Sequence, residues 1–120
     1  MKPTESELEI LQILWQKGPS TVRQVHDVLV QNRALGYTTT LKLMQIMFEK
    51  EILTRTDQGR FHIYTAAMEE EATQNDLLDR FVNAAFRGSA MKLVMQTLGN
   101  HSASKEELDE IKKLIEGLQK

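Results

Sequence analysis

Apolar residues in the first third of the chain recur every three or four positions, which is the spacing of one face of an amphipathic helix. Thr4 and Glu7 form a capping-box pattern before the first run, and Gly18-Pro19 ends it. Ser20 is then placed to cap a second helix. The pattern predicts two short helices with these core positions: Leu8, Leu11, Leu14 and Trp15 in the first, and Val22, Val25, Val28 and Leu29 in the second.

A third helical run follows a turn led by Gly36 and ends near Glu51. Its core positions, spaced by three, one, three and one, are Thr40, Leu43, Met44, Met47 and Phe48. The opposite face offers short hydroxyls, a cation and an amide, which can reach base edges and phosphates. A solvated helix face explains the same pattern, so both interpretations stay open. The outward residues are Thr38, Thr39, Lys42 and Gln45.

The period changes from helical to alternating after the third run. Residues 52–56 and 60–65 are rich in β-branched and aromatic side chains, and Asp57-Gln58-Gly59 between them supplies a short loop. Alternation places Phe61 and Ile63 on one face of the hairpin, with Arg60, His62 and Tyr64 on the other. Three helices followed by a hairpin are the order of a winged helix-turn-helix. Arg55 and Arg60 are then expected phosphate contacts, the alternative being protection of the ribbon's edge.

Residues 67–120 predict three further helices, separated by Gly88-Ser89 and Gly99-Asn100, with a second capping box at Ser104 and Glu107. Short helices without a core of their own are marginal in isolation. We therefore expect a winged-helix DNA-binding domain over 1–66 and a helical dimerisation domain over 67–120, the alternative being an intramolecular helical cap. The expected dimer contacts are Leu77, Leu78, Phe81, Val82, Phe86, Leu93, Val94, Leu98, Ile111, Ile115 and Leu118.

The composition of the 120-residue chain is that of a globular protein, with 41% hydrophobic and 27% charged residues. Residues 1–66 carry 8 Lys/Arg against 7 Asp/Glu, and residues 67–120 carry 7 against 10. A charge this close to neutral argues against a large attractive field for nucleic acid. DNA binding would therefore need basic residues clustered on one face of the protein, and two copies of that face.

Several classes of site are disfavoured. The chain has no cysteine, so it forms no disulfide and no thiolate metal site. Its three histidines are far apart in sequence and fit no catalytic or metal-binding spacing, so we expect neither an enzyme nor a cofactor. No apolar run approaches the roughly 20 residues of a membrane span, and residues 1–5 do not resemble a signal peptide. We expect no membrane insertion and a cytoplasmic location.

Several short segments together resemble the penicillinase-repressor (BlaI/MecI/CopY) family, from about Glu5 to the C-terminus. The resemblance implies a mainly α-helical fold with a β-hairpin wing and a C-terminal dimerisation region. The segments that carry it are Tyr37-Thr38-Thr39, Lys50-Glu51-Ile52-Leu53, Gly59-Arg60, Tyr64-Thr65 and Ser104-Lys105-Glu106-Glu107.

The resemblance implies a homodimeric transcriptional repressor that binds a palindromic operator through the third helix and the wing. It also implies a membrane sensor-protease partner that relieves repression by cutting the C-terminal domain. With Tyr37 added from the family segment, the expected contacts to double-stranded DNA are Tyr37, Thr38, Thr39, Lys42, Gln45, Arg55 and Arg60. The alternative function is a winged-helix module that binds protein and not DNA, which the near-neutral charge favours slightly.

This chain departs from the family at four points. It lacks the C-terminal cysteines that bind metal in the copper-responsive branch. Where the antibiotic-responsive branch is cut at an Asn-Phe bond, an ungapped match from Gly88 places Gln96-Thr97. Ile46 stands where many members carry a basic residue, and Glu51 where many carry glycine.

Overall fold

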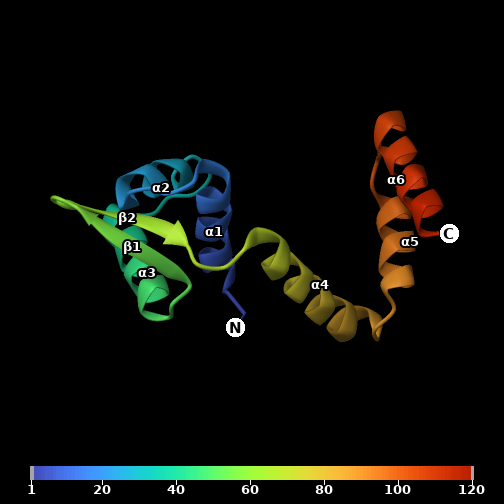
Figure 1. The fold of residues 1–120 in the computed structure, drawn as a ribbon, viewed down its shortest axis with the longest axis horizontal. Helices are drawn as coiled ribbons and strands as arrows, with labels where there is room; N and C mark the ends of the chain where they lie inside the picture. Colours follow the sequence, from blue (N-terminus) through green and yellow to red (C-terminus); the bar gives the residue numbers. More distant parts are fainter. Residues whose placement is uncertain (1, 120) are drawn as a thin grey trace. The chain divides into compact units, whose positions relative to one another are not determined.

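The computed structural model describes residues 2–119, and over that range it contains six helices and one antiparallel hairpin (Figure 1). The prediction of a mainly helical winged-helix fold is confirmed. The chain divides into two compact units, residues 1–77 and 78–120. The elements are α1 (Glu5–Lys17), α2 (Val22–Leu29), α3 (Tyr37–Glu49), β1 (Leu53–Gln58), β2 (Phe61–Ala66), α4 (Glu70–Phe86), α5 (Ala90–Asn100) and α6 (Lys105–Leu118).

Local capping signals position most of the helix starts. Thr4 and Glu7 form the predicted capping box of α1, and Ser104 and Glu107 form that of α6. The prediction for α2 is wrong, because Thr21 and not Ser20 is the cap. The backbone of Ser20 is held instead by Tyr64, whose N–H donates to the Ser20 carbonyl at 2.8 Å and whose carbonyl accepts from the Ser20 N–H at 3.0 Å.

The core of the first unit lies between α1, α2, α3 and the base of the hairpin. The predicted core of α3 is confirmed, with Met44 and Met47 fully buried. In α1 the sequence pattern missed Ile10, which is fully buried, while the predicted Leu8 is only half-buried. The largest fully buried side chains are Ile10, Leu11, Val25, Thr40, Met44, Met47, Ile52, Leu53 and Tyr64.

The hairpin turns one face toward this core. Strand β1 pairs with β2 so that Arg55 lies opposite Tyr64, and the turn falls at Gly59-Arg60, where Gly59 has a φ of 66°. Tyr64 is fully buried, whereas Phe61 on the other face remains 63% exposed. The Tyr64 hydroxyl has no hydrogen-bond partner among the described residues. The buried position in β2 is therefore taken by the side chain that carries a polar group.

Two contacts close the first unit after the hairpin. The indole N–H of Trp15 donates to the Met68 carbonyl at 2.9 Å, and the Ala67 N–H donates to the Ile52 carbonyl at 2.9 Å. At the exit of α3, Glu51 takes a φ of 66°. That left-handed conformation costs an L-residue about 1–2 kcal/mol.

In the second unit most of the large apolar residues are exposed, although Val82 is buried. Neither α5 nor α6 contains a buried residue. The Ser89 hydroxyl caps α5 by accepting from the Lys92 N–H at 3.1 Å, after a break at Arg87 and Gly88, which both have positive φ. The predicted break at Gly88-Ser89 is confirmed, and a serine caps each of α5 and α6 although neither helix contains a buried residue.

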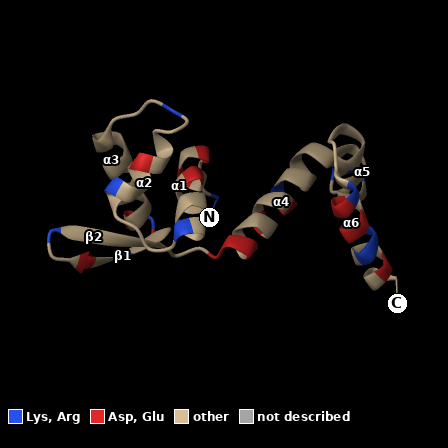
Figure 2. Ribbon diagram, turned by 90° about the horizontal axis from the view of Figure 1, so that it is seen from above, with Lys and Arg blue, Asp and Glu red and all other residues tan. Residues whose placement is uncertain are grey.

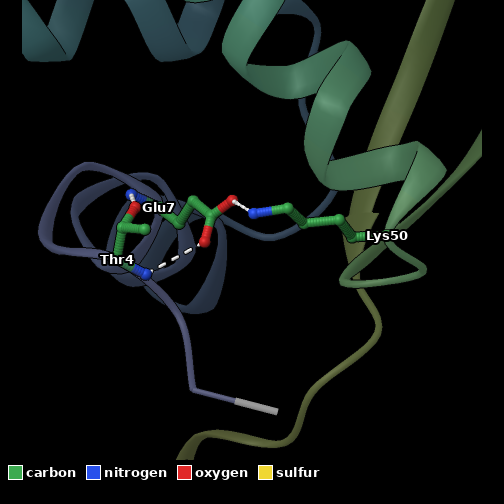
Figure 3. Close-up of polar contacts among 3 residues, drawn as sticks. All are labelled: Thr4, Glu7 and Lys50. Atoms are coloured by element: carbon green, nitrogen blue, oxygen red, sulfur yellow. Dashed lines mark hydrogen bonds and ion pairs between the residues drawn. The ribbon is translucent and has the colours of Figure 1, made fainter.

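Glu7 does more than cap α1. Its carboxylate lies 2.8 Å from the Lys50 ammonium beyond the end of α3 and accepts from the Thr4 N–H at 2.9 Å (Figure 3). Burial acts to raise the pKa of Glu7, but Lys50 and the Thr4 amide outweigh that effect, so the pKa lies below its ordinary value of 4.5. The pair joins α1 to the exit of α3.

The lowered pKa predicts an acid-dependent loss of stability. Ionised Glu7 stabilises the fold above its unfolded pKa near 4.5, and this contribution is lost as the pH falls through the lower folded pKa. Glu7→Gln should flatten this dependence and cost about 1 kcal/mol at neutral pH. Lys50→Met should raise the folded pKa of Glu7 towards its unfolded value and so reduce the acid-dependent loss. Urea unfolding followed by fluorescence of Trp15, the single tryptophan, tests this; equal pH profiles for wild type and Glu7→Gln would contradict it.

Candidate nucleic-acid interface

One buried polar contact sets the rotation of α3. The Thr40 hydroxyl lies 2.8 Å from Nδ1 of His26 on α2, and both side chains are buried. The His26 ring also meets the Tyr37 ring edge-on, with their centroids 5.6 Å apart. Because unpaired polar groups are costly to bury, this contact favours the one rotation of α3 in which Thr40 faces α2.

This rotation leaves the predicted polar row of α3 on the surface. Thr38, Thr39, Lys42 and Gln45 are all exposed. The helix N-cap is Gly36, and no side chain caps the first turn. The positive end of the helix dipole therefore lies beside the two threonines, where it favours anions.

The two aliphatic residues on this side of α3, Leu41 and Ile46, differ in exposure. Leu41 is half-buried and packs against the core. Ile46 is exposed, with 36% of its surface accessible.

Tyr37, which the family resemblance placed among the DNA contacts, is half-buried. The Arg23 guanidinium of α2 lies over its ring, 4.1 Å from the centroid. Sequence reasoning missed Arg23, because only the fold brings this α2 side chain to the start of α3.

The two predicted arginines of the hairpin have different surroundings. Arg55 is half-buried on the face turned toward α3, with its guanidinium 4.0 Å from the Phe48 ring centroid. Arg60 is exposed in the turn. Close to the turn, the Asp57 carboxylate lies 2.6 Å from Nδ1 of His62, its direct partner in register.

The charges of the first unit are unevenly distributed. Glu7 pairs with Lys50, and Glu9 pairs with Arg33. Figure 2 shows that acidic positions dominate α1. In the second unit, by contrast, acidic and basic positions alternate along α6. Among the described residues, no ion pair forms with the four cations around α3 and the hairpin, which are Arg23, Lys42, Arg55 and Arg60.

An open depression of about 380 Å³ lies between α2, the start of α3 and the hairpin. Arg23 borders it from α2 and Arg60 from the hairpin. Its remaining lining residues are Thr21, Val22, Tyr37, Leu41, Phe61, His62 and Tyr64.

Six of the eleven predicted dimer residues are exposed. Val82 is buried, and Leu77, Phe86, Leu93 and Ile111 are half-buried. The other six are exposed: Leu78, Phe81, Val94, Leu98, Ile115 and Leu118. The sequence interpretation did not include Met91, Met95 and Leu114, which are also exposed. Met91, Val94, Met95 and Leu98 share one face of α5, by their spacing.

Residues 2–119 contain neither a metal-binding cluster nor a membrane-spanning helix. No group of three acidic or histidine side chains in that range could hold a metal ion. None of its helices combines the length and the apolar content that a bilayer crossing demands.

Comparison with known proteins places the chain among bacterial regulators. A family model described as penicillinase repressor matches residues 3–117. The penicillinase repressor of Bacillus licheniformis is 22% identical over 113 residues, covering 94% of this chain and 88% of that protein. The transcriptional regulator BlaI of Mycobacterium tuberculosis is 31% identical over 85 residues, 69% of this chain and 62% of its own length. The methicillin resistance regulatory protein MecI of Staphylococcus aureus is 18% identical over 112 residues, 93% of this chain and 91% of its own.

Neighbouring threonines of α3 provide a matched test of the buried contact. Thr40→Val keeps the side-chain shape but leaves Nδ1 of His26 without its partner, so it should cost about 1–3 kcal/mol of unfolding free energy. Thr39→Val, at an exposed position, should change it by less than about 0.5 kcal/mol. Thermal unfolding of both variants measures the difference. Equal melting temperatures would mean that the His26–Thr40 contact does not hold α3 in place.

Proposed function

Because this chain belongs to the penicillinase repressor family, we propose that it is a homodimeric, sequence-specific DNA-binding repressor of transcription that recognises a palindromic operator in the cytoplasm. The single observation that carries the proposal is the exposed row on α3. Thr38, Thr39, Lys42 and Gln45 stand clear of the core on a helix whose opposite face is buried. The family consists of transcriptional regulators, which are not enzymes.

The chemistry of this row suits the major groove of DNA. A helix of 13 residues is about 20 Å long, and the groove admits an α-helix. The Gln45 amide can pair with the N6 and N7 edge of adenine, and the Lys42 ammonium can reach guanine or a phosphate. The hydroxyls of Thr38 and Thr39, beside the positive end of the helix dipole, can bind backbone oxygens.

The hairpin acts as the wing in this proposal. Arg60 in the exposed turn would contact the phosphate backbone next to the groove that α3 occupies. Arg55 would contact a second phosphate from the face beside Phe48, whose ring already orients its guanidinium. Both arginines lack a carboxylate partner among the described residues, which leaves them available to phosphates.

Dimer formation through the second unit is supported by its uncovered apolar residues. A contiguous apolar surface on a single chain marks an interaction site, and α5 and α6 bury none of their residues alone. A second copy would supply the missing cover through a two-fold contact. Such a dimer presents α3 twice, which is why we expect an operator with inverted symmetry.

A membrane sensor-protease is the proposed partner that relieves repression. Gln96-Thr97, at the position that corresponds to the bond cut in related repressors, lies inside α5. The Thr97 hydroxyl donates to the Leu93 carbonyl at 2.7 Å. A protease would need to unwind this turn, or to cut elsewhere in the chain.

Selection of bound duplexes from a random pool tests the proposal directly. We expect the retained sequences to share an inverted repeat, with half-site centres separated by one or more helical turns of about 10 base pairs. A single unrepeated site would remove the homodimer from the proposal. Failure to enrich any sequence would favour the alternative, a winged-helix module that binds protein.

The salt dependence of duplex binding tests the residues. Lys42→Ala and Arg60→Ala should each weaken binding and reduce the slope of log K against log salt by about 0.9 per half-site. Lys17→Ala is the control, because Lys17 borders a different depression with Asp27 and Gln31. Wild-type slopes for both Lys42→Ala and Arg60→Ala would refute the assignment of these contacts.

A further inference from the structure

Arg23 occupies a position that the stability of α2 does not explain. It lies in the first turn of α2, where the positive end of the helix dipole disfavours a cation. That turn contains no acidic residue, and Arg23 forms no ion pair among the described residues. Arg23 is therefore available to an anion from outside the chain.

A series of contacts orders the guanidinium of Arg23 before any ligand binds. It lies 4.1 Å from the centroid of the Tyr37 ring, which meets the His26 ring edge-on at 5.6 Å. His26 is in turn fixed by the buried contact with Thr40. A side chain ordered before binding loses less entropy when it binds, so Arg23 is prepared for a ligand.

The depression beside Arg23 has the chemistry of a sugar-phosphate site. Arg23 and Arg60 border it from two different elements. Phe61, which is exposed although it is one of the largest apolar side chains of the hairpin, contributes an aromatic surface. Two guanidiniums suit a phosphodiester, and an exposed ring suits the apolar face of a deoxyribose.

We propose that this depression binds one phosphodiester of the operator backbone in each half-site. Arg23, oriented by Tyr37, and Arg60 contact the phosphate, while the adjoining deoxyribose packs on Phe61. This inference rests on the proposed function and extends it, because it adds a contact from α2. It also gives Tyr37 the role of a positioning residue that supports Arg23.

Arg23→Gln, measured on the selected operator, tests the contact. The variant should reduce the slope of log K against log salt by about 0.9 per half-site, or about 1.8 for a dimer. Its loss of affinity relative to wild type should then shrink roughly 3.5-fold per half-site between about 50 and 200 mM salt. Arg23→Lys should retain the slope, and Lys17→Gln should behave as wild type.

Neutral methylphosphonate, placed at one backbone position at a time in the operator, separates this contact from general attraction. At one phosphate per half-site, the replacement should weaken binding by wild type and by Lys17→Gln, and it should weaken binding by Arg23→Gln less, because that variant keeps only Arg60 at the phosphate. Tyr37→Leu should reproduce part of the Arg23→Gln loss and add little to it in the double variant, whereas Tyr37→Phe, which keeps the aromatic ring under Arg23, should lose less affinity than Tyr37→Leu.

The outcomes distinguish the two proposals. If Arg23→Gln keeps the wild-type slope and phosphate profile while Lys42→Ala reduces the slope, the contact from α2 is refuted and the DNA-binding function stands. The same conclusion follows if free inorganic phosphate competes with the duplex equally for wild type and Arg23→Gln. If wild type binds duplexes without salt dependence, both proposals fail.

Discussion

The hydrogen bond between His26 and Thr40 is the constraint on which the arrangement of the first unit depends. It is a buried side-chain contact between α2 and α3, and neither group can turn to water if it breaks. Because residues on a helix are separated by about 100°, a rotation of α3 by one position would bury Thr39 and expose Met44. The apolar face and this one polar contact therefore agree on a single orientation.

The elements that depend on neighbouring residues could be predicted from the sequence. The face of α3 follows from the spacing of its apolar residues, and the caps at Thr4 and Ser104 each involve a glutamate three positions away. Ser20 was assigned wrongly because its backbone is held by Tyr64, 44 positions away. The Glu7–Lys50 ion pair was missed for the same reason, since a capping pattern contains no information about a second partner.

The candidate interface shows the same division between local and distant information. The outward row lies on one helix, so its exposure could be inferred from spacing alone. Arg23 belongs to another helix, and only the packing of α2 on α3 brings it over Tyr37. The burial of the hairpin faces could not be predicted either. Alternation separates two faces, but it does not indicate that the face with Tyr64 is buried and that Phe61 is exposed.

The backbone of Glu51 is a point at which the first unit could gain stability. Its left-handed backbone costs about 1–2 kcal/mol, which the remaining contacts must offset, and the nearby Glu49 adds a second negative charge at the negative end of α3. Many relatives, according to the family resemblance, carry glycine at this exit and avoid the conformational cost. Glycine in place of Glu51 would remove this strain, and the helix exit is therefore where stability could rise without altering any group on the outward row.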